Sequence, residues 1–186
     1  MDAIIGAGGQ IKPNDPLSGL LTEGKPKALL PIAGKPMVQW TLDAVAGSEQ
    51  IDNVIIIGLN EKHSLNCGTK NVYYIQSGNT MFDNARSGCS LALELNPKAT
   101  QVLWISADLP LIEPLMLDWF INQVGMSQHE LYYQIIDRNV MESRFPKSRR
   151  TYTKLKGKTV CGGDVSAINP NIAANVHPAF KKISAS

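Results

Sequence analysis

Short apolar runs bounded by turn-forming residues recur along the chain. The clearest is Asn53–Gly58, in which one valine and three isoleucines follow one another without a polar interruption. An uninterrupted β-branched run of this length is typical of a strand that is buried on both faces. Comparable runs predict further strands at residues 2–5, 72–75, 101–106, 131–136 and 165–168, with an extended stretch at 151–155.

Helical spacing separates several of these runs. Residues 36–46 carry apolar side chains at intervals of three and four, which predicts a helix. Helices are also expected over residues 80–95 and 113–124. Strands that alternate with helices of this length predict an α/β fold of three layers. We expect a Rossmann-like arrangement in which helices cover both faces of a mainly parallel, mixed central sheet.

The length and composition of the chain limit its class. Its 186 residues suffice for a single domain over residues 1–186 and are too few for two ordinary ones. The sequence stops after Lys181–Ser186 without a recognisable terminal helix, which leaves open whether it is a piece of a longer protein. A content of 44% hydrophobic residues excludes disorder. We expect no membrane span and no signal peptide, because the apolar stretches are about five residues long where a span needs roughly 18–20.

The cysteines and histidines show no metal-ligand spacing. Three cysteines lie far apart and form no C-x-x-C pair, so we expect buried free thiols rather than a disulfide framework or a structural zinc site. This cysteine usage favours a reducing, cytoplasmic location. The residues concerned are Cys67, Cys89 and Cys161, with His63, His129 and His177.

A net charge of +2 hides a strongly basic segment. Between Arg138 and Lys158, eight cationic side chains oppose Glu142 alone, so this segment carries +7 and the rest of the chain about −5. Such a patch indicates an anionic partner, either nucleic acid or a phosphorylated small molecule. The segment has no recognised nucleic-acid motif and no interleaved aromatic platform, which favours the small molecule.

A glycine loop follows the first predicted strand. Glycines at Gly6–Gly9 allow consecutive backbone N–H groups to approach an anion closely. The loop is not a Rossmann G-x-G-x-x-G motif, because position 11 is Ile11 and the prolines that follow prevent a helix. It is not a P-loop either, since Ile11-Lys12-Pro13 does not supply that motif. The pattern predicts a phosphate-binding loop that carries Lys12.

The segments after this loop add a resemblance to a known family. Lys25-Pro-Lys-Ala-Leu-Leu30 and Ala33-Gly-Lys-Pro-Met37 complete an opening that resembles the nucleotidyltransferases of glycosyltransferase-A type fold. That superfamily includes sugar-1-phosphate nucleotidylyltransferases, molybdenum-cofactor guanylyl- and cytidylyltransferases and methylerythritol-phosphate cytidylyltransferase. The resemblance covers residues 2–40, resumes at 77–88 and 105–110, and is faint after residue 130 apart from 162–170. Three departures from the family pattern, which leave the choice of nucleotide open, are Gln10, Lys12 and Asn84.

The resemblance implies a Mg²⁺-dependent enzyme. It would move a nucleoside monophosphate from an NTP to a small phosphorylated acceptor and release pyrophosphate. By the same resemblance, the β- and γ-phosphates of the NTP would be held by Gly6, Ala7, Gly8, Gly9 and Lys12, and the α-phosphate by Lys27. The base or ribose would contact Gly78 and Asn84. Asp108 would bind the metal, and Asp164 would be a further metal ligand or an acceptor contact. Lys27 and Lys12 are then the catalytic cations. The forked guanidinium groups suited to the acceptor phosphate are those of Arg144, Arg149 and Arg150.

Simpler interpretations remain beside these. The loop could be a tight strand exit, Asp108 could cap the next helix, and Asp164 could be a turn residue. A glycosyltransferase that uses a nucleotide sugar is a second function, although Ser106-Ala107-Asp108 lacks the first carboxylate of its usual D-x-D. A non-catalytic domain that senses a nucleotide or sugar phosphate is a third, and Lys27 together with Asp108 argues against it.

Overall fold

The computed structural model describes residues 1–15, 17, 19–20 and 24–174. The expectations about Lys181–Ser186 and about His177 lie outside these residues. In chain order the elements are β1 (Ala3–Gly6), η1 (Lys27–Leu29), β2 (Pro31–Ile32), β3 (Lys35–Pro36), α1 (Met37–Gly47), β4 (Asn53–Ile57), η2 (Glu61–His63), β5 (Asn71–Ile75), α2 (Met81–Leu95), β6 (Val102–Ser106), α3 (Pro114–Gly125), β7 (Leu131–Asp137), α4 (Arg138–Arg144), β8 (Thr153–Leu155), β9 (Lys158–Ile168) and α5 (Pro170–Ala174).

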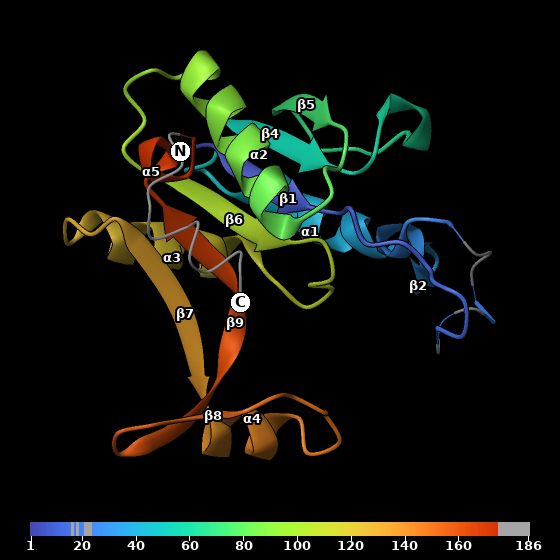
Figure 1. The fold of residues 1–186 in the computed structure, drawn as a ribbon, viewed down its shortest axis with the longest axis vertical. Helices are drawn as coiled ribbons and strands as arrows, with labels where there is room; N and C mark the ends of the chain where they lie inside the picture. Colours follow the sequence, from blue (N-terminus) through green and yellow to red (C-terminus); the bar gives the residue numbers. More distant parts are fainter. Residues whose placement is uncertain (16, 18, 21–23, 175–186) are drawn as a thin grey trace.

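The main sheet has a parallel part and an antiparallel part. Its strand order is β5-β4-β1-β6-β9-β7, and β8 also pairs with β9 (Figure 1). The strands β5, β4, β1 and β6 are parallel, whereas β9 runs antiparallel to β6, β7 and β8. Gly6 lies opposite Ile57 of β4 and Ser106 of β6, so these three strands end at one edge. In parallel sheets this carboxyl edge is where ligands bind.

Helices cover both faces of the sheet, which confirms the three-layer α/β prediction. Side chains alternate along β1 because successive residues of a strand point to opposite faces. Ile5 packs in a core with α1 and α3, whereas Ile4 packs in a second core with α2 and α5. In Figure 1, α2 lies in front of the sheet and α3 behind it. A Cβ on Gly88 of α2 would lie 2.9 Å from Cγ2 of Ile4, so glycine allows that helix to approach the sheet closely.

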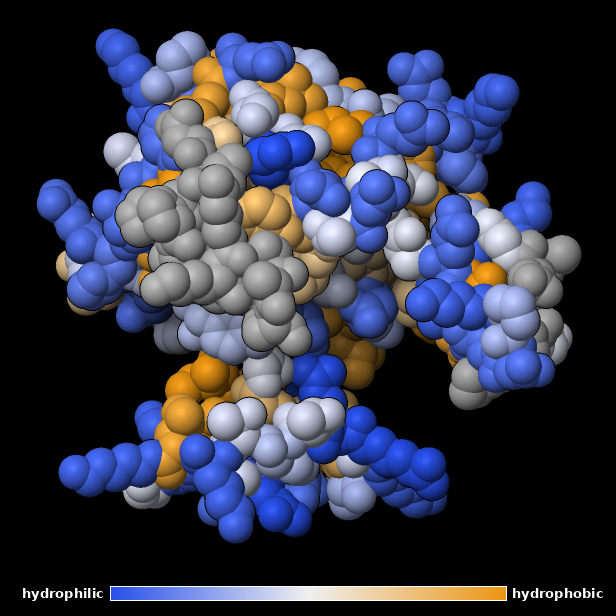
Figure 2. Space-filling view, in the orientation of Figure 1, coloured by the Kyte–Doolittle hydropathy of each residue, from blue (hydrophilic) through white to orange (hydrophobic). Residues whose placement is uncertain are grey.

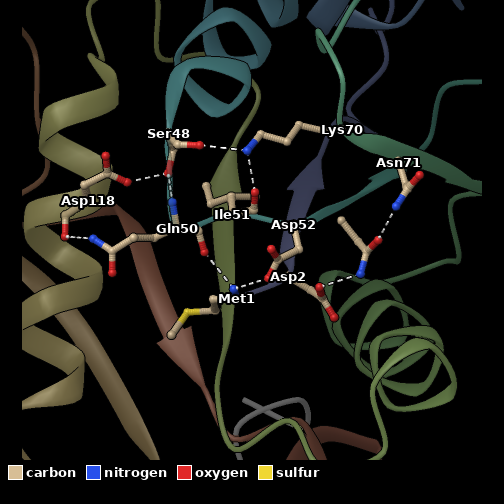
Figure 3. Close-up of polar contacts among 10 residues, drawn as sticks. Met1, Asp2, Ser48, Gln50, Ile51, Asp52, Lys70, Asn71 and Asp118 are labelled. Atoms are coloured by element: carbon tan, nitrogen blue, oxygen red, sulfur yellow. Dashed lines mark hydrogen bonds and ion pairs between the residues drawn. The ribbon is translucent and has the colours of Figure 1, made fainter.

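Polar contacts tie down the amino-terminal edge of the sheet, opposite the carboxyl edge (Figure 3). The Met1 ammonium group donates to the Gln50 carbonyl at 2.7 Å and to the Asp52 carboxylate at 2.8 Å. The Lys70 ammonium group donates to the carbonyls of Ser48 at 2.8 Å and Ile51 at 2.6 Å. These bonds satisfy loop carbonyls at this edge and fasten the loop between α1 and β4 to its neighbours.

Residues 134–164 project from the body as an arm (Figure 1). It consists of the outer parts of β7 and β9 together with α4 and β8. The sequence predicted β7 to within one residue, β8 as part of an extended stretch and the end of β9, but not α4. That helix has only seven residues, and it is held by local contacts: the Asp137 side chain accepts from Asn139 N, and Arg138 pairs with Glu142 at 2.8 Å. Such contacts leave no apolar period in the sequence.

Other predictions agree with the structure closely. Pro36 and Thr80 are the N-cap residues of α1 and α2 and stand just outside the helices, one residue from the predicted starts. The three cysteines are free and buried, as expected. No helix within the described residues is long and apolar enough to cross a membrane.

Candidate functional site

The glycine loop leaves β1 between the ends of β4 and β6. Ala7 N donates to the Ile57 carbonyl at 2.9 Å, and the Gly6 carbonyl accepts from Ala107 N at 3.3 Å. Gly58, whose φ is +95°, presses against the loop, because a Cβ there would lie 2.3 Å from Cα of Gly8. The backbone of the loop is therefore fixed by its neighbours, and a side chain at Gly58 would push it away.

Lys27 is brought to this loop by backbone pairing. Gln10 forms an antiparallel bridge with Pro26, and Lys27 N donates to the Gly9 carbonyl at 2.8 Å. The Lys27 ammonium group forms an ion pair with the Asp15 carboxylate at 2.5 Å. The hydrogen bond from Lys27 lowers the pKa of Asp15, so the carboxylate stays charged and orients the lysine.

Two of the predicted loop residues are exposed. Gly9 and Lys12 both face solvent, and the Lys12 carbonyl closes a turn by accepting from Asp15 N at 3.1 Å. Asp15 was not predicted as a site residue, because an aspartate in a turn-rich segment gives no signal of a partner twelve positions away.

The start of α2 lies against the other side of the loop. Gly78 N donates to Oδ1 of Asn84 at 2.7 Å, and Nδ2 of Asn84 donates to the Ser77 hydroxyl at 3.3 Å. A Cβ on Gly8 would lie 2.4 Å from that hydroxyl oxygen. The structure thus brings Gly78 and Asn84 to the glycine loop, and it adds Ser77, which sequence reasoning passed over.

Asp108 follows the end of β6 at the same edge. Its exposed carboxylate accepts a hydrogen bond from the Ser106 hydroxyl. The alternative that Asp108 caps the next helix is wrong, because α3 begins six residues later at Pro114 with Glu113 as its N-cap. Thr41 of α1 supports the turn, since its hydroxyl accepts from Leu109 N at 3.4 Å.

Asp164 lies within β9, so the alternative that it is a turn residue is wrong. The pairing of β7 with β9 shifts register here: Tyr133 lies opposite Ser166, whereas Ile135 lies opposite Gly162. Such irregularities re-aim side chains beside binding sites. Gly163 is required in this stretch, because a Cβ there would lie 2.8 Å from Cβ of Gln134.

The predicted acceptor arginines are not equivalent. Arg150 donates to the Gly162 carbonyl at 2.6 Å and pairs with Asp164 at 3.2 Å. Burial opposes the charge on the Arg150 guanidinium, but the Asp164 carboxylate and the Cys161 side chain together outweigh burial and raise the pKa of Arg150. Arg144 lines the same cavity as Asp164, whereas Arg150 and the exposed Arg149 do not line it.

This cavity, of about 460 Å³, lies between the arm and the body. Asp108, Asp164 and Arg144 line it, whereas the glycine loop and Lys27 do not. The loop and the cavity adjoin at the ends of β1 and β6, where Ala107 N donates to the Gly6 carbonyl. The site therefore has two compartments that meet at one edge of the sheet.

The two carboxylates in the cavity are the candidate metal ligands. Mg²⁺ is commonly bound by one or two carboxylates together with substrate phosphates and water. Among the described residues, no group of three or more histidine, cysteine, aspartate and glutamate side chains is placed to hold a metal ion. Asp108 and Asp164 are the carboxylates of the cavity that could share such an ion with a phosphorylated ligand, and Asp164 is also paired with Arg150.

Comparisons with known proteins agree with this architecture. The family described as MobA-like NTP transferase domain matches residues 19–156, a range that begins after the glycine loop and ends before Asp164. The chain is 26% identical over 127 residues to a 3-deoxy-manno-octulosonate cytidylyltransferase of Zea mays. It is 33% identical over 97 residues to a 2-C-methyl-D-erythritol 4-phosphate cytidylyltransferase of Parasynechococcus marenigrum (strain WH8102).

These matches cover only part of each of the two relatives. The aligned regions cover 68% and 50% of this chain, but only 42% of each of the two relatives. A hypothetical transferase from Thermus thermophilus has a similar structure, with a TM-score of 0.75 and 23% identity over 99% of this chain and 71% of that one. At that identity the likeness concerns the fold.

Proposed function

The chain belongs to the MobA-like NTP transferase domain family, and on that premise we propose that it transfers a nucleoside monophosphate from an NTP to a small phosphorylated acceptor. The observation that carries this proposal is the meeting of two compartments at one sheet edge. One contains the glycine loop with Lys27, and the other contains Asp108 and Asp164. Both relatives described above are cytidylyltransferases, which favours CTP as the donor.

The loop compartment would bind the nucleotide. Backbone N–H groups of Gly8 and Gly9 and the Lys12 ammonium group would hold the β- and γ-phosphates, whereas the Ala7 N–H, predicted to join them, already donates to the Ile57 carbonyl. Lys27 would stabilise the charge that gathers on the α-phosphate, and Gly78 and Asn84 would contact the base or ribose. At an effective dielectric constant near 20, one cation about 4 Å from a phosphate oxygen contributes on the order of 4 kcal/mol. Two lysines are therefore of the right magnitude for this task.

Asp108 and Asp164 would hold Mg²⁺ together with phosphate oxygens. The fit rests on their shared cavity and on an all-oxygen ligand set. When bound, the ion would offset the negative charge of the departing pyrophosphate.

The reaction then needs no general base. An oxygen of the acceptor phosphate, already anionic, forms a bond to the α-phosphorus while the bond from that phosphorus to the pyrophosphate oxygen breaks in line. Arg144 and Arg150 would attract the acceptor phosphate, and the exposed Arg149 would add to the positive electrostatic potential around them. We place this activity in the cytoplasm, which the buried free thiols support.

A pyrophosphate assay tests the proposal. The protein is incubated with Mg²⁺, each of the four NTPs and a panel of phosphorylated sugars and alcohols. We expect pyrophosphate release that depends on the acceptor and is fastest with CTP. Binding of an NTP without turnover would indicate a sensor domain instead, and transfer from a nucleotide sugar would indicate a glycosyltransferase.

A further inference from the structure

The cavity between the arm and the body has largely apolar walls. Most of its lining side chains are aliphatic or aromatic, and they come from the segment after β6, from α3, from β7 and from α4. They include Leu111, Met116, Ile136, Val140, Met141 and Phe145. Hydrophobic side chains are visible at the narrowing between body and arm in Figure 2.

Several of these side chains lie open to solvent. Leu111 is 70% exposed, Val140 57% and Phe145 40%. Large apolar side chains that gather at a concave surface without being covered indicate a binding site. The volume of about 460 Å³ is within the range of small-molecule sites, which is roughly 300–1,000 Å³.

The polar groups of the cavity are few and mostly charged. They are the carboxylates of Asp108 and Asp164, the Arg144 guanidinium and the Gln134 amide. Arg144 takes part in none of the ion pairs formed among the described residues. A guanidinium group without a carboxylate partner matches a phosphate, which it can bind through two parallel hydrogen bonds.

From this arrangement we propose that the acceptor is an amphiphilic phosphomonoester. Its phosphate binds near Arg144, and its carbon part, an alkyl chain or an aromatic ring, packs against Val140, Met116 and Phe145. The inference rests on the proposed function, since it names the class of acceptor for that transfer.

The walls discriminate against a polyhydroxylated acceptor. Once Asp108 and Asp164 hold the metal, Gln134 is the polar side chain of the lining that is left for the carbon part of the acceptor. Each hydroxyl that loses water without gaining a hydrogen-bond partner disfavours binding, whereas each methylene group that is buried from water favours it. Both effects favour an apolar carbon part.

A matched pair of acceptors tests this proposal. Hexyl phosphate and sorbitol 6-phosphate both carry one phosphomonoester on a six-carbon chain, and they differ in their hydroxyl groups. We expect kcat/KM for hexyl phosphate to exceed that for sorbitol 6-phosphate at least tenfold, with the KM for the NTP unchanged. Hexyl phosphate should also bind without nucleotide, with a negative heat-capacity change in calorimetry that marks apolar burial.

A matched pair of variants tests where the acceptor lies. Val140→Asn places a neutral polar side chain in the wall and should lower kcat/KM for hexyl phosphate about tenfold. Leu155→Asn changes a similarly exposed apolar residue of the arm that does not line this cavity, and it should change nothing. Both residues are exposed, so neither change threatens folding.

The outcomes separate this inference from the proposed function. If no acceptor releases pyrophosphate while hexyl phosphate binds and Val140→Asn weakens that binding, the proposed function fails and the apolar ligand class stands. If sorbitol 6-phosphate is the better acceptor, or if hexyl phosphate does not bind, the inference is overturned. It is also overturned if sedimentation shows a dimer that Val140→Asn dissociates, because a second copy then covers the cavity.

Discussion

The parallel part of the sheet and the arm use apolar residues in opposite ways. In β4, Val54–Ile57 are completely buried, and they carry the glycine loop on a packed scaffold. In the arm, Val140 and Phe145 line the cavity and are 57% and 40% exposed. Apolar side chains in the parallel part stabilise the fold, whereas those of the arm remain available to a ligand.

The comparison suggests a division of work between the two compartments. The loop compartment presents backbone groups, glycines and a lysine held by Asp15, all of which suit the constant part of an NTP. The cavity compartment presents side chains that vary in size and polarity. We therefore expect changes near the loop to affect every reaction of the protein, and changes in the arm to affect the choice of acceptor.

The largest effect is expected from Asp108→Asn, at the boundary of the two compartments. Loss of this carboxylate charge should lower turnover at least about 100-fold, equivalent to about 3 kcal/mol of transition-state stabilisation. Asp52→Asn, at the opposite edge of the sheet, is the control and should keep full turnover. Steady-state pyrophosphate release measures both. Full activity in Asp108→Asn would remove this residue from the mechanism.

Lys27→Ala should also lower turnover about 100-fold or more, because the cation that we propose for the α-phosphate is lost. Asp15→Asn leaves Lys27 in place but removes its ion-pair partner. We expect a change of less than about tenfold in the KM for the NTP from that second variant, since only the orientation of the lysine is relaxed. Equal losses in kcat for the two variants would contradict a direct role of Lys27.

Each of the two regions contains a glycine with positive φ, so the same substitution can be made in both and its effect on the free energy of unfolding compared. Gly58→Ala combines backbone strain with a clash against Gly8 and should lower the free energy of unfolding by more than about 3 kcal/mol. Gly157→Ala in the arm has similar strain, with φ at +81°, but meets no atom within 4 Å. We expect a loss of about 1–2 kcal/mol there. Urea unfolding measures both, and equal losses would show that the loop is less confined than its contacts indicate.

The smallest effects concern the arginines of the arm. Arg150→Ala removes the partner of Asp164 and should raise the KM for the acceptor about tenfold, with little change in the KM for the NTP. Arg149→Ala should change the acceptor KM less than about threefold, because Arg149 is exposed and, unlike Arg150, forms no ion pair with a carboxylate of the cavity. Initial rates at varied acceptor concentration distinguish them. A larger effect of Arg149→Ala would place the acceptor phosphate outside the cavity.

The parts of the fold that the sequence predicted well are those in which burial dictates residue type. The run of isoleucines in β4 and the apolar spacing in α1 are direct consequences of packing on the sheet, and both elements were found within one or two residues. The beginning of β9 was not predicted, because Gly162 and Gly163 are typical of a turn. In the structure these glycines allow Tyr133 and Gln134 to approach closely.

Some residues of the site could be predicted from the sequence and others could not. The resemblance led to the loop, Lys27 and Asp108, and the structure brings these residues to one edge. Asp15 and Ser77 could not be predicted, since their contacts with Lys27 and Asn84 depend on how separate segments meet. The apolar cavity was missed as well, because its walls come from five segments that are separate in the sequence.

The register shift between β7 and β9 lies where Asp164 and the start of the arm meet, so a change there would move both. Asp164 lies in the very stretch where the strands lose their pairing, and the arm that carries Val140 and Phe145 begins there. Adding or removing one residue at this irregularity would tilt the arm and displace the carboxylate in a single step. Under the proposed function, such an insertion would change the space for the acceptor, while the glycine loop stays anchored to β4 through the bond from Ala7 N to the Ile57 carbonyl.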